Sequence, residues 1–319
     1  MAGFGCRLPR ERHRRSSPPE RIETFARSVV VACALLAAIT LFPSAPVVAA
    51  TAKVVHVTKT SSWPTPSNDP RGIAYDRRAH RLLVSDSEAD EAAGASWNHK
   101  NLFISTRVGR LVAARSLAKA TVEPEDVAWD GWTKSLYVVD DDTRRVYRFR
   151  AGTDRRLGTG DDFVSTVVRT RRFGSYQPQG LDFVRHPRML IVTDSVGGRV
   201  YELRPGKDGQ FGSPDDVVLR FSTKARGFRY PTDVAFDRRT HNLFIVGPME
   251  NVILQTTLHG RVVRRIDLSG TGILNASGIT FAPGPYGGKH RIYIADCGRD
   301  DSLHPGSRDG QIVVLKVGA

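Results

Sequence analysis

A short apolar segment recurs five times along the chain, and each copy ends at an equivalent position. In residues 135–140 the segment reads SLYVVD. The end positions are 54, 54, 53 and 49 residues apart, and they are Asp86, Asp140, Asp194, Gly247 and Asp296. A fixed period of this size indicates a stacked or circular array of one supersecondary unit. The repeat therefore predicts a single repetitive domain.

Each copy is preceded by a second recurring segment that carries an aromatic residue at one fixed place. These segments are residues 70–76, 124–130, 178–183, 231–237 and 276–281. Apolar side chains on either side of a small central residue are typical of a short strand covered on both faces. Four of the segments begin with proline, which has no N–H to give to a ladder and marks the entrance of a strand.

Further strands complete the unit. A third segment that alternates apolar and polar residues follows every copy, and a fourth follows only the first four copies. Residues 54–60 supply the missing strand, which would close a ring and leave no open edge. We therefore predict an all-β fold, a β-propeller of five four-stranded blades closed by an N-terminal strand. A six-bladed propeller is the alternative, whereas a solenoid would need capping repeats at both ends.

Residues 1–50 have the composition of a leader. Seven arginines precede an apolar run of fifteen residues, 28–42, and prolines and small residues follow it. This order is typical of a secretory signal peptide. An uncleaved membrane anchor is less favoured, because a bilayer span needs about 20 residues. We predict a secreted or cell-envelope protein in which residues 51–319 form one domain, with no stable membrane span after cleavage.

The chain is strongly basic. Its 47 Lys and Arg residues against 33 Asp and Glu residues give a formal net charge of +14. Such a protein associates with polyanions such as acidic glycans. The basic residues form no stripe with interleaved aromatics, so no specific nucleic-acid partner is predicted. The expected partner of this monomer is a small molecule, a glycan or a protein.

The predicted ligand face lies at one mouth of the central tunnel. Connections from fourth to first strands and from second to third strands emerge on that face of a propeller, where loops from every blade converge. The face would carry residues that precede first strands or end second strands: Arg71, Glu125, Gln179, Thr232, Asp86, Asp140, Asp194 and Asp296. For the four aspartates the favoured interpretation is structural, because Asp commonly caps turns through backbone N–H groups.

Places where the repeat fails are better functional candidates. Gly247 replaces Asp in the fourth copy, and Asp182 brings a charge into a first strand. The long connections 87–100 and 298–310 would become neighbours on ring closure, and they carry Glu88, Asp90, Glu91, Trp97, His99, Asp300 and Asp301. This seam is predicted to bind a cation, a cationic ligand or a sugar. A pair of solvated loops is the equally weighted alternative.

Two acidic hairpins suggest calcium. Carboxylates on a tight Gly-bearing loop offer the oxygen ligands that Ca²⁺ prefers. The stronger candidates are Asp208, Asp215 and Asp216, and the weaker ones are Asp154, Asp161 and Asp162. Arg155 and Arg156 bring positive charge to the weaker hairpin. Plain hairpin turns are the favoured alternative, and no other cofactor is expected.

The repeat resembles a known group of propellers. First strands of the form Pro-x-Gly-[Ile/Val]-Ala-aromatic-Asp followed by Leu-Tyr-Val-x-Asp are similar to the NHL and SMP-30/gluconolactonase-like group. Residues 206–216 and 85–91 resemble, more closely, the Gly-x-Asp-Gly hairpins and the early acidic motif of exported bacterial propeller proteins. The resemblance implies a propeller fold over residues 53–317. It leaves function open, since such propellers include enzymes, binding modules and scaffolds, and most relatives have six blades.

Sequence evidence for catalysis is thin. The chain has no Gly-x-Ser-x-Gly elbow and no His-Glu-x-x-His motif. Resemblance to SMP-30 lactonases implies one metal held by Glu, Asn and Asp side chains, for which Glu125 and Asp126 are weak candidates, with Asn251 or Asn275. We therefore predict a non-catalytic binding module or scaffold. A metal-dependent hydrolase of lactones, other esters or phosphoesters is the alternative.

Overall fold

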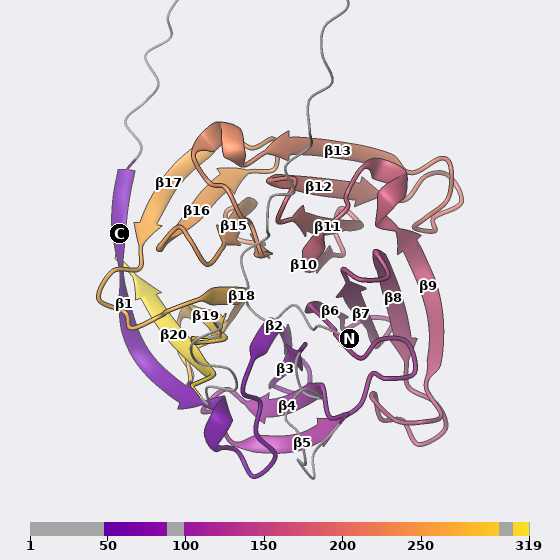
Figure 1. Cartoon of the computed structure of the whole chain (residues 1–319), viewed down its shortest axis with the longest axis horizontal. Coiled ribbons are helices and arrows are strands. Elements are labelled where there is room, and N and C mark those ends of the chain that lie inside the picture. The colour runs from indigo at the N-terminus through magenta and orange to yellow at the C-terminus, as the bar shows by residue number, and fades with distance from the viewer. Residues whose placement is uncertain (1–47, 88–98, 300–308, 319) are drawn as a thin grey trace, which may run out of the picture.

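The computed structural model describes residues 48–87, 99–299 and 309–318, and these residues form an all-β ring around a central axis (Figure 1). Three antiparallel four-stranded sheets follow one another along the chain. Blade 1 comprises β2 (Pro70–Asp76), β3 (Arg81–Asp86), β4 (Leu102–Thr106) and β5 (Leu111–Arg115). Blade 2 comprises β6 (Asp126–Asp130), β7 (Ser135–Asp140), β8 (Arg145–Arg150) and β9 (Phe163–Arg169). Blade 3 comprises β10 (Pro178–Val184), β11 (Met189–Asp194), β12 (Arg199–Arg204) and β13 (Val217–Ser222).

The last two blades are joined into one eight-stranded sheet by the first strand of the described chain. Blade 4 comprises β14 (Asp233–Asp237), β15 (Asn242–Val246), β16 (Val252–Thr257) and β17 (Val262–Asp267). Blade 5 comprises β18 (Ala276–Pro283), β19 (His290–Asp296), β20 (Gln311–Val317) and β1 (Val48–Lys59). β1 pairs antiparallel with β20, and its first four residues pair parallel with β17.

The β-propeller fold predicted from the sequence is confirmed, and the described residues contain twenty strands in three four-stranded sheets and one eight-stranded sheet. β1 closes the ring as expected (Figure 1), although it is longer than the predicted residues 54–60 and starts at Val48, before the expected domain boundary at residue 51. Short 3-10 helices lie between some blades: η1 (Thr60–Ser62), η2 (Thr170–Phe173) and η3 (Lys224–Arg226). In the part of the chain that the structure describes, no helix is long and apolar enough to cross a membrane.

The hydrophobic core consists of five clusters, one between each pair of neighbouring blades. Second strands lie at the centre of these clusters, and all six residues of β7 and of β11 are buried. Aromatic residues from the recurring segments pack across the blades. The rings of Tyr137 in blade 2 and Phe183 in blade 3 stack with centroids 5.2 Å apart. Burial on both faces explains why the first two strands of each unit read as apolar.

Candidate functional site

The third residue of each recurring segment that forms the innermost strand of a blade is either glycine or aspartate. In chain order these residues are Gly72, Asp126, Gly180, Asp233 and Gly278. A Cβ atom on Gly72 would lie 2.0 Å from Oδ1 of Asp126, and one on Gly180 would lie 2.4 Å from the Cα of Asp233. Gly72 and Gly180 therefore leave the space that Asp126 and Asp233 of the neighbouring blades occupy. Because backbone atoms are among the close neighbours, the space cannot open by a side-chain movement.

Buried carboxylates join the inner strands to one another. Asp126 Oδ2 accepts a hydrogen bond from the N–H of Leu181 at 2.6 Å, and Asp233 Oδ2 accepts one from Ile279 at 2.6 Å. Each bond links the innermost strand of one blade to that of the next, and these strands are not paired with each other in a ladder. Asp182, the charge that broke the repeat, bonds Phe236 of the next blade in the same way at 2.7 Å. These three carboxylates therefore hold the innermost strands of neighbouring blades together. We call these five strands the inner ring, and the loops around the tunnel start or end at them.

Burial changes the protonation of these groups. It raises the pKa of Asp126 to about 7 and that of Asp182 to about 6, against the opposing effect of their backbone hydrogen bonds. The pKa of Asp233 lies well above its usual value because of burial and then because of the charge of Asp126. The side chains of Asp126 and Asp233 also shift each other's pKa. Two interacting buried carboxyl groups titrate as a pair and favour sharing one proton.

An ion pair occupies the predicted ligand face. Arg71 donates from Nη2 to Oε2 of Glu125 at 2.6 Å and from Nε at 3.1 Å, and both side chains are buried. Burial raises the pKa of Glu125 although Arg71 opposes the shift. Asp141 accepts a hydrogen bond from Nε2 of Gln177 beside this pair, and burial followed by the charge of Glu125 raises its pKa. Glu125 and Asp126, the weak catalytic candidates, thus have partners within the ring.

Thr232 and Gln179 are two further candidates of this face. Thr232 donates from Oγ1 to the carbonyl of Ala276 at 3.0 Å, which joins blade 4 to blade 5. Gln179 lies partly exposed in the equivalent position of blade 3.

The aspartates that end second strands cap loops. Asp194 accepts hydrogen bonds from the N–H groups of Tyr176 and Gly197, at 2.7 and 2.6 Å. The other three make similar bonds, at Asp86 with Ser67 and Asp69, at Asp140 with Thr143, and at Asp296 with Leu274, Asn275 and Gly298. This is the structural role that the sequence favoured for them. Gly247 breaks the pattern for a steric reason, because a Cβ there would lie 2.0 Å from the carbonyl oxygen of Tyr230.

The predicted acidic seam lies almost wholly outside the described residues. This applies to Glu88, Asp90, Glu91, Trp97, Asp300 and Asp301. Of the seam residues, His99 is described, and it is exposed with φ of 69°. The seam therefore stays a prediction.

Carboxylates of the two acidic hairpins bond groups of their own loops. Asp215 accepts hydrogen bonds from the N–H of Lys207 at 2.6 Å and from Oγ of Ser213 at 2.5 Å, and Asp216 accepts one from the N–H of Gly212. Asp208 bonds the N–H of Gln210. The first hairpin repeats this arrangement with Asp154, Asp161 and Asp162. Within the described ranges, no group of three or more His, Cys, Asp or Glu side chains is arranged to hold a metal ion.

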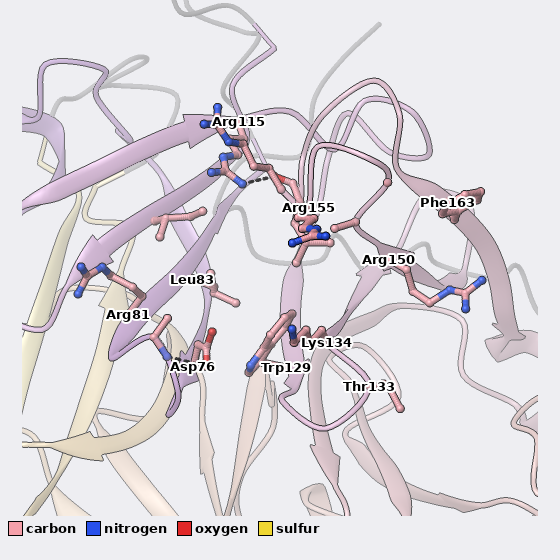
Figure 2. A pocket seen from close by; sticks show the side chains of 16 residues that line it. Asp76, Arg81, Leu83, Arg115, Trp129, Thr133, Lys134, Arg150, Arg155 and Phe163 are labelled. Atoms are coloured by element: carbon pink, nitrogen blue, oxygen red, sulfur yellow. Dashed lines mark hydrogen bonds between the residues drawn. The ribbon is translucent and has the colours of Figure 1, made fainter.

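A basic pocket lies between blades 1 and 2 (Figure 2). Its volume is about 690 Å³. Six of its side chains are cationic, and they are Arg81, Arg115, Lys134, Arg150, Arg155 and Arg156. Asp76 is the one acidic residue of the lining, and the apolar part comprises Leu83, Ile104, Trp129, Leu157 and Phe163. None of the six cationic side chains forms a salt bridge among the described residues.

The hairpin between β8 and β9 forms one wall of the basic pocket. Arg115 at the end of β5 donates from Nη1 to the carbonyl of Leu157 at 2.8 Å, which connects blade 1 to that hairpin (Figure 2). Burial and then the charge of Arg156 lower the pKa of Arg115, so the site concentrates positive charge in a partly desolvated place. An anion placed there would relieve this repulsion.

Sequence reasoning missed the basic pocket. It is built from turns between first and second strands and from a hairpin between third and fourth strands, so it opens on the face opposite to the predicted ligand face. One signal was available: Arg155 and Arg156 replaced the residues expected of a calcium hairpin. Arg155 and Arg156 lie close to Arg81 and Arg115 only because blade 1 packs against blade 2, and the sequence alone does not show this packing.

Comparisons with known proteins define the class as a β-propeller. A luciferin-regenerating enzyme is similar in structure with a TM-score of 0.52 and 13% identity, over 85% of this chain and 95% of that chain. The PQQ-bound aldose sugar dehydrogenase of Streptomyces coelicolor gives a TM-score of 0.51 and 13% identity, over 84% and 98%. A putative gluconolactonase gives 0.46 and 12%, over 84% and 93%.

These likenesses show the fold alone, because the identities are low. The expected resemblance is confirmed at the level of the β-propeller fold, whereas membership of the NHL or SMP-30 group stays a prediction. No family model and no curated protein matches the sequence.

Proposed function

We propose that this protein is an exported, monomeric and non-catalytic β-propeller binding module, and that it holds an anionic ligand in the basic pocket. The observation that carries the proposal is the composition of the pocket lining, which has six cationic side chains, one carboxylate and several apolar side chains. The volume of about 690 Å³ suits a small-molecule or oligosaccharide site, since such sites commonly measure about 300–1,000 Å³. The leader predicted over residues 1–50 supports export.

The lining explains how an anion would be held. Guanidinium groups present planar pairs of N–H donors that match carboxylate, sulfate or phosphate oxygens. Trp129 and Leu83 offer an apolar surface to the uncharged part of a ligand. Because Arg115 is fixed by Leu157, at least one donor is positioned before the ligand arrives. Positioned donors lower the entropy that binding costs.

The alternative function is a metal-dependent hydrolase with Glu125 and Asp126 as ligands. The ion pair of Glu125 with Arg71, and the backbone hydrogen bonds of Asp126, support a structural role for both side chains. A screen of lactones, other esters and phosphoesters in the presence of Mg²⁺, Ca²⁺, Mn²⁺ or Zn²⁺ separates the two functions. The proposal expects no turnover above the rate without protein. Turnover that EDTA abolishes would establish the hydrolase instead.

Binding is tested by titration calorimetry with a sulfated disaccharide and a uronate disaccharide. The pocket variant combines Arg81→Gln, Lys134→Gln and Arg150→Gln. The control variant combines Arg110→Gln, Arg261→Gln and Lys316→Gln, which are exposed residues outside the described pockets and remove the same charge. We expect the pocket variant to lose at least tenfold in affinity, or about 1.4 kcal/mol, and the control less than twofold. Equal losses, or no binding to the unmodified protein, would contradict the proposal.

Calcium at Asp208, Asp215 and Asp216 is a separate proposal, supported by three carboxylates on one short loop. Ca²⁺ accepts six to eight oxygen ligands, and carboxylates are its usual protein donors. Under this proposal Ca²⁺ raises the Tm relative to EGTA, and the double variant Asp215→Asn, Asp216→Asn loses the increase. An identical Tm in Ca²⁺ and EGTA would remove the proposal.

A further inference from the structure

A second basic hollow lies where the central tunnel opens on the same face as the basic pocket. Its volume is about 190 Å³. Three of its arginines come from three blades, and each directly follows an inner strand: Arg77 after β2, Arg185 after β10 and Arg238 after β14. The repeat therefore places guanidinium groups at one end of the tunnel, and we refer to these three residues as the mouth arginines.

The charge of the mouth arginines is offset only in part, by Asp182 and Asp130 acting on Arg238. None of them forms a salt bridge in the described part of the chain. Two acidic residues of the lining cap their own turns, since Asp76 accepts from the N–H of Arg78 at 2.8 Å and Asp130 from that of Trp132 at 3.0 Å. Burial and then the charge of Arg77 lower the pKa of Arg238. An anion at the mouth would relieve this repulsion.

In both hollows an arginine makes a cation–π contact with an aromatic ring. The guanidinium carbon of Arg185 lies 3.8 Å from the ring centre of Trp132 at the mouth. In the basic pocket that of Arg150 lies 5.8 Å from the ring centre of Phe163. Such cation–π contacts hold the guanidinium plane and leave its N–H edges for a ligand. Each arginine occupies one face of its ring, which reduces the surface on which nucleobases would stack and favours an acidic glycan over a single-stranded nucleic acid.

The two hollows adjoin each other. Asp76 and Trp129 line both, and Arg77 follows Asp76 directly in the chain. A ligand in the basic pocket thus needs only a short extension along the same face to reach the mouth arginines. From this continuity we infer that the tunnel mouth is a second anion subsite, and that the ligand is an acidic polysaccharide whose repeated anionic groups occupy both subsites. The inference rests on the proposed function of the basic pocket.

Asp182 limits how deep an anion can go. It lies further inside the tunnel, where Arg77 and Arg238 also line the wall. Its carboxylate bonds the N–H groups of Phe183 and Phe236, at 2.7 Å each. A negative charge at this depth repels an anion, so the ligand lies across the mouth and does not thread the tunnel.

The test is a length series of oligosaccharides, measured by calorimetry with the unmodified protein. Sulfated and uronate series of two, four, six and eight sugar units distinguish the two anionic chemistries. We expect affinity to rise at least tenfold once the chain is long enough to reach the mouth. A mouth variant, Arg77→Gln with Arg185→Gln and Arg238→Gln, should lose this increase and still bind the disaccharide within about twofold of the unmodified protein.

The outcomes separate the inference from the proposed function. If the disaccharide does not bind the unmodified protein, the proposed function fails. If the disaccharide binds but affinity does not grow with length, or the mouth variant retains the growth, the second subsite is wrong. Tighter binding of an oligothymidylate of equal charge would overturn the glycan assignment. The Arg110, Arg261 and Lys316 control variant should retain the growth, which excludes an effect of net charge alone.

Discussion

Asp126 and Asp233 shift each other's pKa across the inner ring, although blade 3 lies between their strands. Both also accept backbone hydrogen bonds from a neighbouring blade. One shared proton allows the two interacting groups to stay buried. The stability of the ring is therefore expected to depend on pH.

The first prediction concerns that dependence. Because the pKa of Asp126 is raised to about 7, the folded state keeps a proton that the unfolded chain releases near pH 4. The free energy of unfolding should fall as pH rises from about 4 to about 7, by at most about 4 kcal/mol. Urea unfolding between pH 5 and 8 measures this slope. Asp233→Asn should flatten it, and the exposed control Asp208→Asn should not; equal slopes in all three proteins would refute the shared proton.

The second prediction concerns the ion pair of Arg71 and Glu125. Both side chains are buried, at 6% and 5% exposure, so Glu125→Gln removes the carboxylate that accepts two hydrogen bonds from the buried Arg71 guanidinium. The expected loss in the free energy of unfolding is about 3–5 kcal/mol. The double variant Arg71→Met, Glu125→Leu should recover most of it. Denaturant titrations check both values, and a single variant as stable as the unmodified protein would show that the pair is dispensable.

The third prediction concerns the glycines of the inner strands. Gly72→Ala would place a Cβ 2.0 Å from Oδ1 of Asp126 and 2.5 Å from its Cα. We expect a destabilisation of about 1–3 kcal/mol, because the backbone must move. Gly160→Ala is the matched control, since nothing lies within 4 Å of its Cβ position. Thermal unfolding should separate the two variants by several degrees, and identical Tm values would mean that the ring tolerates the added atom.

Most of the fold could be predicted because each blade corresponds to one local, repeated pattern of apolar and turn residues in the sequence. The copies of the repeat indicate the period and the buried strands, and four of the five carry the turn-capping aspartate. The split last unit predicted that residues near Val54 would close the ring, and β1 does so. Strand order in a propeller follows chain order, so no long-range pairing had to be guessed apart from this closure.

The candidate site was harder to predict, because it depends on contacts between blades. The alternation of Gly72, Asp126 and Gly180 is visible in the sequence. The interaction of Asp126 with Asp233, however, arises only when the blades are arranged in a ring. The basic pocket joins Arg81 and Arg150, which belong to different repeats. The sequence shows no stripe of basic residues with interleaved aromatics, whereas the packing of two neighbouring blades brings six basic residues together.

The proposed function depends on the basic pocket, and residue-resolved arginine modification tests it most directly. The protein is treated with phenylglyoxal with and without a saturating sulfated oligosaccharide, and modified sites are quantified by mass spectrometry. The account predicts that ligand protects Arg81, Arg150 and Arg155 at least fivefold and leaves Arg261 unchanged. Binding of the oligosaccharide with no protection of those three arginines would contradict it.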